Sequence, residues 1–265
     1  MKAKLALASL AALGAIFLTS ARAQVTGQTV EYRAGDTTLE GYIAYDVSNT
    51  ARRPAVLVVH DWMGVSDHTK EVAQELAKLG YLAFAADIYG KGVRPADRTL
   101  ASAEAGKYKA DRKLLRERVN AAFKEMKGHA LAEPDKTAAI GFCFGGTTVL
   151  ELARSGAEVG GVVSFHGSLD SPAPADGKNI KAKVLVLHGA EDPFVKKEDI
   201  DAFQKELIDA GVDWQMVYYG NAVHSFTQKK AGNDKSKGTA YEEKAARRSW
   251  ESMKDFFNEV FGVTK

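Results

Sequence analysis

Hydrophobic and polar residues alternate along two stretches near the start of the chain, 28–33 and 39–45, with Gly35-Asp36 between them. A period of two residues is typical of strands that bury one face, so these stretches predict an antiparallel hairpin. Further along, the pattern changes to short, nearly continuous apolar runs, which are typical of parallel strands covered on both faces. These runs occupy residues 54–60, 81–86, 137–142, 159–166, 183–189 and 213–219.

Segments with a helical period follow most of these runs, at residues 67–79, 111–126, 144–153, 197–210 and 241–261. No element is predicted for 90–110, which is rich in Gly, Lys, Arg and Ala, and polar loops are expected at 167–181 and 228–238. Strands that alternate with helices predict a doubly wound, mostly parallel α/β sheet with helices on both faces, preceded by the hairpin. Ligands bind such sheets at the carboxyl ends of the strands, so site residues should directly follow strands.

The first 23 residues have a pattern of their own. Lys2 and Lys4 precede an apolar run, 5–18, and Ala21-Arg22-Ala23 comes next. A basic start, a short apolar core and an A-x-A site are typical of a secretory signal peptide, here 1–23 and cut before Gln24. The run is too short to span a bilayer comfortably. We therefore expect secretion across the inner membrane, to the periplasm, and no membrane attachment after cleavage.

Composition indicates that residues 24–265 form a single domain. The chain has 265 residues, 45% of them hydrophobic and 26% charged, which is enough for one full core. Three of its 36 Lys and Arg residues lie in the predicted signal peptide, so the mature protein is close to neutral against 34 acidic residues. A near-neutral chain gives no support for nucleic-acid binding. We expect a monomer that acts on a small molecule.

The run 137–142 leads into Gly141-Phe142-Cys143-Phe144-Gly145-Gly146, which is the G-x-S-x-G nucleophile elbow with Cys in the Ser position. A sharp strand-to-helix turn brings the flanking residues very close together, and Gly141 and Gly145 have no Cβ to clash there. The side chain of Cys143 should project above the sheet, at a helix N-terminus that favours negative charge. The alternative is a core cysteine in a glycine-rich turn. A lone thiol in an oxidising compartment is easier to explain as a reagent.

A thiol nucleophile needs a base to accept its proton, and histidine is the usual one. Four of the six histidines directly follow predicted strands: His60, His166, His188 and His224. The other two, His68 and His129, lie in or near helices and are expected to be solvated. His224 is the last of the six and lies between the final strand and the loop 228–238.

The base needs a carboxylate to orient it, and Asp192 follows the strand 183–189 in a turn that Pro193 closes. The order Cys143, Asp192, His224 is the nucleophile–acid–histidine order of α/β-hydrolases. All three follow strands, as a site in this kind of sheet requires. They are the predicted catalytic residues.

Acyl transfer also needs two N–H donors for the oxyanion. The elbow offers the N–H of Phe144, and the loop after the first parallel strand offers that of Trp62. Trp62, Phe144 and Tyr89 are expected to line an apolar pocket. Nothing in this chemistry calls for a metal or a cofactor.

With these residues in view, the chain resembles the dienelactone hydrolase family over nearly the whole mature sequence. The resemblance is carried by residues 141–146, 189–194 and 224–226, and by Asp87-Ile88-Tyr89-Gly90. It implies an α/β-hydrolase fold and a Cys-His-Asp triad. It also implies hydrolysis of a lactone or small ester through a thioester acyl-enzyme, without metal or cofactor.

The chain departs from the family pattern at three positions. The Glu that contacts the resting thiol in founding members is replaced by Asp61, and the two arginines that hold the substrate carboxylate are replaced by Lys91 and Gln228. Lys is a poorer bidentate partner than Arg, and Gln is uncharged. We therefore expect small esters or lactones rather than the dienelactone itself, with Asp61, Tyr89 and Lys91 as candidates for substrate binding or thiol activation.

Two alternatives use the same residues differently. The triad would also suit a thioester, a polymer ester or an acyl transfer. A non-catalytic binding protein on a hydrolase scaffold is the alternative from another class.

Overall fold

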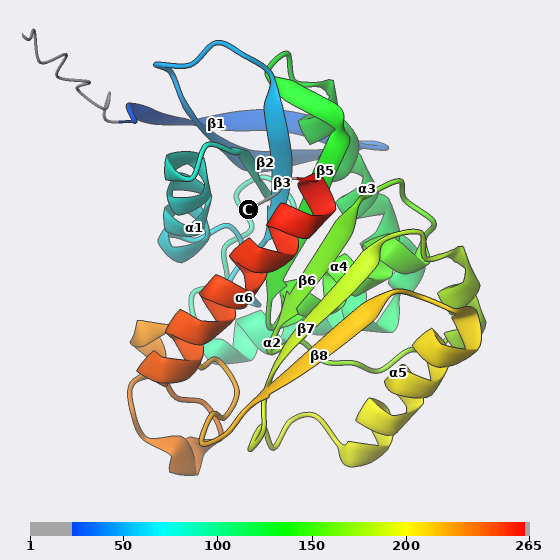
Figure 1. Ribbon diagram of the computed structural model, residues 1–265. Helices are drawn as coiled ribbons and strands as arrows, with labels where there is room; N and C mark the ends of the chain where they lie inside the picture. The colour runs from blue at the N-terminus through cyan, green and yellow to red at the C-terminus, as the bar shows by residue number, and fades with distance from the viewer. Residues whose placement is uncertain (1–22, 263–265) are drawn as a thin grey trace, which may run out of the picture.

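Eight strands form one sheet in the computed structural model, which describes residues 23–262 (Figure 1). Their order across the sheet is β1-β2-β4-β3-β5-β6-β7-β8. The strands are β1 (Val25–Ala34), β2 (Thr37–Asp46), β3 (Arg53–Val59), β4 (Leu82–Ala86), β5 (Ala132–Phe142), β6 (Gly161–Phe165), β7 (Lys183–Gly189) and β8 (Trp214–Tyr219). The predicted signal peptide lies outside the described residues except for Ala23.

The sheet is mostly parallel, as the sequence predicts. β1 and β2 form the antiparallel hairpin, and β2 also pairs antiparallel with β4. From β4 to β8 every neighbouring pair is parallel. The predicted fold class, an α/β-hydrolase sheet with an N-terminal antiparallel hairpin, is confirmed.

Helices cover both faces of the sheet because successive strand residues point to opposite sides. On β3, Val56 and Val58 pack in one core with α1 and α6, whereas Leu57 and Val59 pack in the other with α3, α4 and α5. Figure 1 shows α6, in red, lying across one face beside α1. The helices are α1 (Asp67–Lys78), α2 (Arg98–Ala110), α3 (Arg112–Gly128), α4 (Phe144–Arg154), α5 (Lys197–Ala210) and α6 (Glu243–Phe261). Within residues 23–262, no helix is both long enough and apolar enough to cross a membrane.

The helix α2 lies in the stretch 90–110, where no element is predicted. Its buried face consists only of Ala101, Ala105 and Tyr108, so the apolar period is weak. The helix begins at a cap that the sequence does offer, since the side chain of Asp97 accepts a hydrogen bond of 2.9 Å from Leu100 N. The loop 167–181 also contains a short 3-10 helix, η1 (Pro174–Asn179).

The chain reverses direction across the sheet between β3 and β5. After β3 it turns outward to β4, and it then returns to place β5 on the other side of β3. The loops that leave β3 and β5 are therefore neighbours at the carboxyl edge of the sheet. This is where α/β sheets bind ligands, and the two loops carry Trp62 and Cys143.

Candidate active site

Cys143 stands at the turn between β5 and α4 with backbone angles φ 54° and ψ −115°. Positive φ is strained for a residue with a side chain, and such strain clusters at functional sites. The backbone N–H of Cys143 bonds to Phe165 O at 3.0 Å, and its carbonyl accepts from Gly146 N at 3.0 Å. The thiol is partly exposed.

Two glycines make this turn possible, as the sequence indicates. A Cβ on Gly141 would lie 2.0 Å from Gly145 O, and a Cβ on Gly145 would lie 2.3 Å from Val59 O. Neither contact leaves room for a methyl group. The elbow therefore packs directly against the backbone of β3.

His224 and Asp192 are joined by a hydrogen bond of 2.8 Å between Nδ1 and Oδ2. The other carboxylate oxygen of Asp192 accepts from Phe194 N at 2.9 Å, so both oxygens are held. The backbone of His224 is fixed by Gly238 O, and its ring meets the edge of Phe194 at a centroid distance of 5.5 Å. The acid thus fixes the ring of His224 with Nε2 free to point elsewhere.

The charge of His224 is set by opposing effects. Burial disfavours the cation, but the charge of Cys143 and hydrogen bonds to Asp192 and Cys143 outweigh it and raise the pKa of His224 to about 10. Cys143 and Asp192 therefore favour the protonated form of the ring against the effect of burial.

The loop after β3 is braced from several sides. Tyr89 is almost fully buried and donates its hydroxyl to Trp62 O at 3.1 Å. The guanidinium of Arg94 bonds to Val65 O at 3.0 Å. Phe144 is the first residue of α4, and its N–H has no carbonyl within the helix to bond. The rings of Tyr89 and His60 contact that of Phe144 at centroid distances of 5.4 and 5.7 Å, so the loop after β3 packs beside the start of α4.

Asp61 and Lys91 are engaged by other protein groups. The carboxylate of Asp61 accepts from Gln228 Nε2 at 2.9 Å and from Met63 N at 2.8 Å. Lys91 forms an ion pair with Glu31 on β1, at the outer edge of the sheet. The structure therefore brings Asp61 and Tyr89 close to the predicted triad but places Lys91 away from it.

The strand-end histidines differ in what surrounds them. His60 is buried beneath the site, and its Nε2 accepts from Ile88 N at 3.3 Å. His166 is fully buried and packs against the ring of His224 at 5.2 Å. His68 was expected to be solvated, and this is wrong: its Nε2 is buried and its ring meets Phe142 at 5.6 Å. A pattern of strands and helices cannot show that α1 turns His68 inward.

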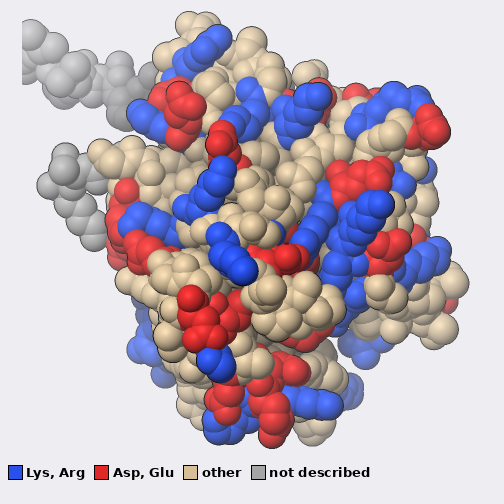
Figure 2. Space-filling view, turned by 90° about the vertical axis from the view of Figure 1, so that its right-hand side faces the viewer, with Lys and Arg blue, Asp and Glu red and all other residues tan. Residues whose placement is uncertain are grey.

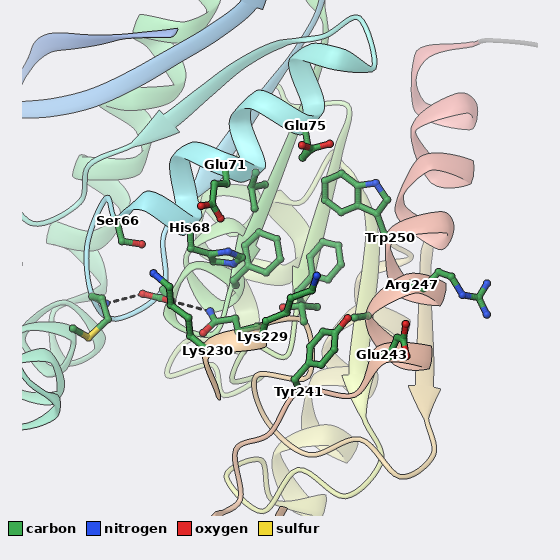
Figure 3. Close-up of a pocket in the computed structure, with 18 of the residues that line it drawn as sticks. Ser66, His68, Glu71, Glu75, Lys229, Lys230, Tyr241, Glu243, Arg247 and Trp250 are labelled. Atoms are coloured by element: carbon green, nitrogen blue, oxygen red, sulfur yellow. Dashed lines mark hydrogen bonds between the residues drawn. The ribbon is translucent and has the colours of Figure 1, made fainter. Parts of the chain in front are cut away.

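A groove of about 950 Å³ lies beside these residues, between α1 and α6 (Figure 3). Phe142 and Phe165 line it with stacked rings 4.7 Å apart, and Trp250 of α6 lies opposite His68 of α1. The hydrogen-bonded pair Asp61 and Gln228 also lines it. Nothing in the sequence periodicity points to this groove.

Charge elsewhere on the molecule is mixed. On the face shown in Figure 2, positive and negative side chains are intermingled. Within residues 23–262, no group of three or more His, Cys, Asp or Glu side chains is placed to hold a metal ion.

The sheet order, the strained turn after β5, and the acid and histidine after β7 and β8 define an α/β-hydrolase. The chain belongs to the dienelactone hydrolase family, whose model matches residues 39–261. This confirms the predictions that the chain is a member of this family and that it is a carboxylic ester hydrolase.

Solved structures and sequence relatives agree with this assignment. The structure "m3DLH" is 42% identical, with a TM-score of 0.86 over 89% of this chain and 99% of the other. The dienelactone hydrolase-like promiscuous phosphotriesterase P91, from metagenomic libraries, is 40% identical, with a TM-score of 0.84 over 89% and 99%. The "Putative carboxymethylenebutenolidase" of Aquifex aeolicus is 29% identical over 87% of this chain and 97% of its own length.

Proposed function

We propose that the protein hydrolyses small carboxylic esters or lactones through an acyl-enzyme on Cys143. The observation that carries this proposal is the buried His224–Asp192 hydrogen bond next to Cys143, whose backbone is strained at a strand-to-helix turn. Asp192 and Cys143 favour the protonated form of His224, so its ring is suited to exchange a proton with the sulfur. The thiolate is the reactive form of a cysteine nucleophile.

The reaction proceeds in two steps on these groups. The sulfur attacks the carbonyl carbon, and the N–H groups of Trp62 and Phe144 hold the resulting oxyanion. The intermediate collapses to a thioester as His224 gives its proton to the leaving alkoxide. Water then attacks the thioester, His224 accepts a proton from that water, and the acid leaves as Cys143 is restored. Asp192 stays ionised and holds the ring in place.

The substrate is expected to be small and not necessarily anionic. Gln228 is uncharged and donates to Asp61, and Lys91 is paired with Glu31, so neither presents a free cation to a carboxylate. A relative from a Bradyrhizobium species, 31% identical over 67% of this chain, has the name "Probable 2-oxo-3-(5-oxofuran-2-ylidene)propanoate lactonase". A panel of short esters, lactones, thioesters and one phosphotriester therefore covers the candidate substrate classes.

Cys143→Ala tests the mechanism on the mature protein. We expect the kcat for p-nitrophenyl acetate to fall by about 10⁴-fold or more, because the covalent step is lost. Circular dichroism should show an unchanged fold. Undiminished hydrolysis by this variant would exclude the cysteine mechanism.

Iodoacetamide separates an enzyme from a binding protein on the same scaffold. An activated thiol should be alkylated quickly near neutral pH. Slow alkylation together with no turnover on the whole panel would favour the binding protein.

A further inference from the structure

His166 follows β6, and both of its ring nitrogens have protein partners. Its Nδ1 accepts a hydrogen bond of 3.2 Å from the backbone N–H of Cys143. The same N–H also donates to Phe165 O. Its Nε2 lies 2.8 Å from the hydroxyl oxygen of Thr227. Thr227 stands three residues after His224 on the same loop. The ring of His166 thus connects the turn that carries the nucleophile with the loop that carries the base.

These partners fix the protonation of the ring. A backbone N–H can only donate, so Nδ1 must carry a lone pair, and the proton of the neutral ring lies on Nε2 and is donated to Thr227. Burial lowers the pKa of His166 well below its usual value, and His224, His68 and His188 act in the same direction. His166 therefore stays neutral beside His224.

The backbone at this junction is strained. Among residues 23–262, four residues other than glycine have positive φ: Cys143, His166, Asn221 and Ser225. Three of them, His166 (φ 40°), Cys143 and Ser225, lie in or beside the two segments that the ring joins. Such strain costs free energy and persists only where the surroundings impose it. Glycine at position 166 would avoid this cost. The presence of histidine there indicates that its side chain has a role that offsets the strain.

We propose that His166 is a positioning residue that holds the turn of Cys143 and the loop of His224 in register, so that the ring of His224 meets the sulfur. This inference rests on the proposed cysteine mechanism. The ring of His166 packs against the ring of His224, but neither of its nitrogens bonds to the sulfur or to the nitrogens of His224. It acts through the backbone N–H of Cys143 at one end and through Thr227 at the other.

Thr227→Val tests the connection without opening a cavity, because Val has nearly the shape of Thr and lacks the hydroxyl. Loss of one buried hydrogen bond should lower both the kcat for ester hydrolysis and the rate of Cys143 alkylation by iodoacetamide about tenfold. We expect KM for p-nitrophenyl acetate to stay as in the wild type and the melting temperature to fall by about 2–4 °C, because the buried Nε2–H of His166 loses its acceptor. Thr227→Ser, which keeps the hydroxyl, should restore both rates. Wild-type rates of turnover and alkylation in Thr227→Val would overturn the proposal.

A second pair of variants addresses the ring itself. Gln at position 166 keeps an N–H donor for Thr227, whereas Leu keeps neither a donor nor an acceptor. His166→Gln should therefore be alkylated faster than His166→Leu, and equal rates would count against the proposal. Alkylation needs no substrate, so it tests the role of His166 even if the protein turns over no ester. Absence of ester turnover would contradict only the proposed function.

Discussion

The charge on His224 is the central feature of the site at the scale of single residues. Burial alone would leave this ring neutral, and the cation is stabilised by Asp192 on one side and Cys143 on the other. The acid is held by its own turn, with one oxygen on Phe194 N and the other on His224. In the proposed mechanism, this ring is the group that delivers a proton to the leaving alkoxide.

Removing the sulfur should change how His224 titrates. In Cys143→Ala both the charge of Cys143 and its hydrogen bond are lost, while the burial that opposes the cation remains. We expect the pKa of His224 to fall from about 10, so that at neutral pH the ring holds less of its positive charge. The ring resonances, followed by NMR between pH 5 and pH 11, report the change.

The matched comparison is Cys143→Ser, which keeps a hydrogen-bonding group but brings no charge at these pH values. The pKa of His224 in Cys143→Ser should lie between its values in the wild type and in Cys143→Ala. A wild-type titration curve in Cys143→Ala would show that Asp192 alone sustains the cation.

At the scale of elements, α4 is fixed by buried charges on the side away from α1 and α6. Arg154 on α4 is almost fully buried and binds Glu206 on α5 through two hydrogen bonds of 2.8 Å. It also bonds to Glu151, which in turn accepts from Arg116 on α3 at 2.8 Å. The helix whose first residues form the elbow is thereby held by both of its neighbouring helices.

Glu206→Gln should destabilise the protein by about 3 kcal/mol, because the buried Arg154 loses the carboxylate that binds it through two hydrogen bonds and keeps only Glu151, which Arg116 shares. Asp201→Asn is a matched control on the same helix, where Lys197 and Asp201 form an exposed pair. It should change stability by about 0.5 kcal/mol or less. Urea unfolding measures both, and equal effects would contradict the structural role given to Arg154.

At the scale of the whole molecule, the groove between α1 and α6 adjoins the loops that follow β3 and β8, although no triad residue lines it. Its volume of about 950 Å³ is at the upper end of ordinary ligand pockets. Its aromatic walls come from β5, β6 and α6, which are distant in sequence. We propose that it receives the larger part of an ester whose carbonyl lies at Cys143.

Trp250→Ala should therefore raise KM for a bulky aromatic ester by about tenfold, since an aromatic contact of this kind is worth about 1 kcal/mol or more. KM for p-nitrophenyl acetate, which is too small to fill the groove, should change by about twofold or less. Steady-state kinetics on the two esters measure the contrast. An equal change for both would place the substrate elsewhere.

Export to the periplasm and the monomeric state remain predictions.

Much of the fold follows from local pattern. The apolar runs of the strands and the amphipathic helices between them predict the parallel sheet. Both patterns are local, because each element buries its own apolar residues. The helix α2 was not predicted, because Ala101 and Ala105 are too small to mark a buried stripe. The candidate triad could be proposed from chain order alone, since each member follows a strand.

The sequence by itself determined the order of the elements along the chain, the glycine-lined turn and the candidate triad, because these depend on local patterns and on which residues follow strands. Only the tertiary structure decided the order of the strands across the sheet, that Gln228 binds Asp61 across 167 positions, and that His68 turns inward. Those contacts join segments whose distance is set by packing of the whole sheet. No local pattern encodes such a distance.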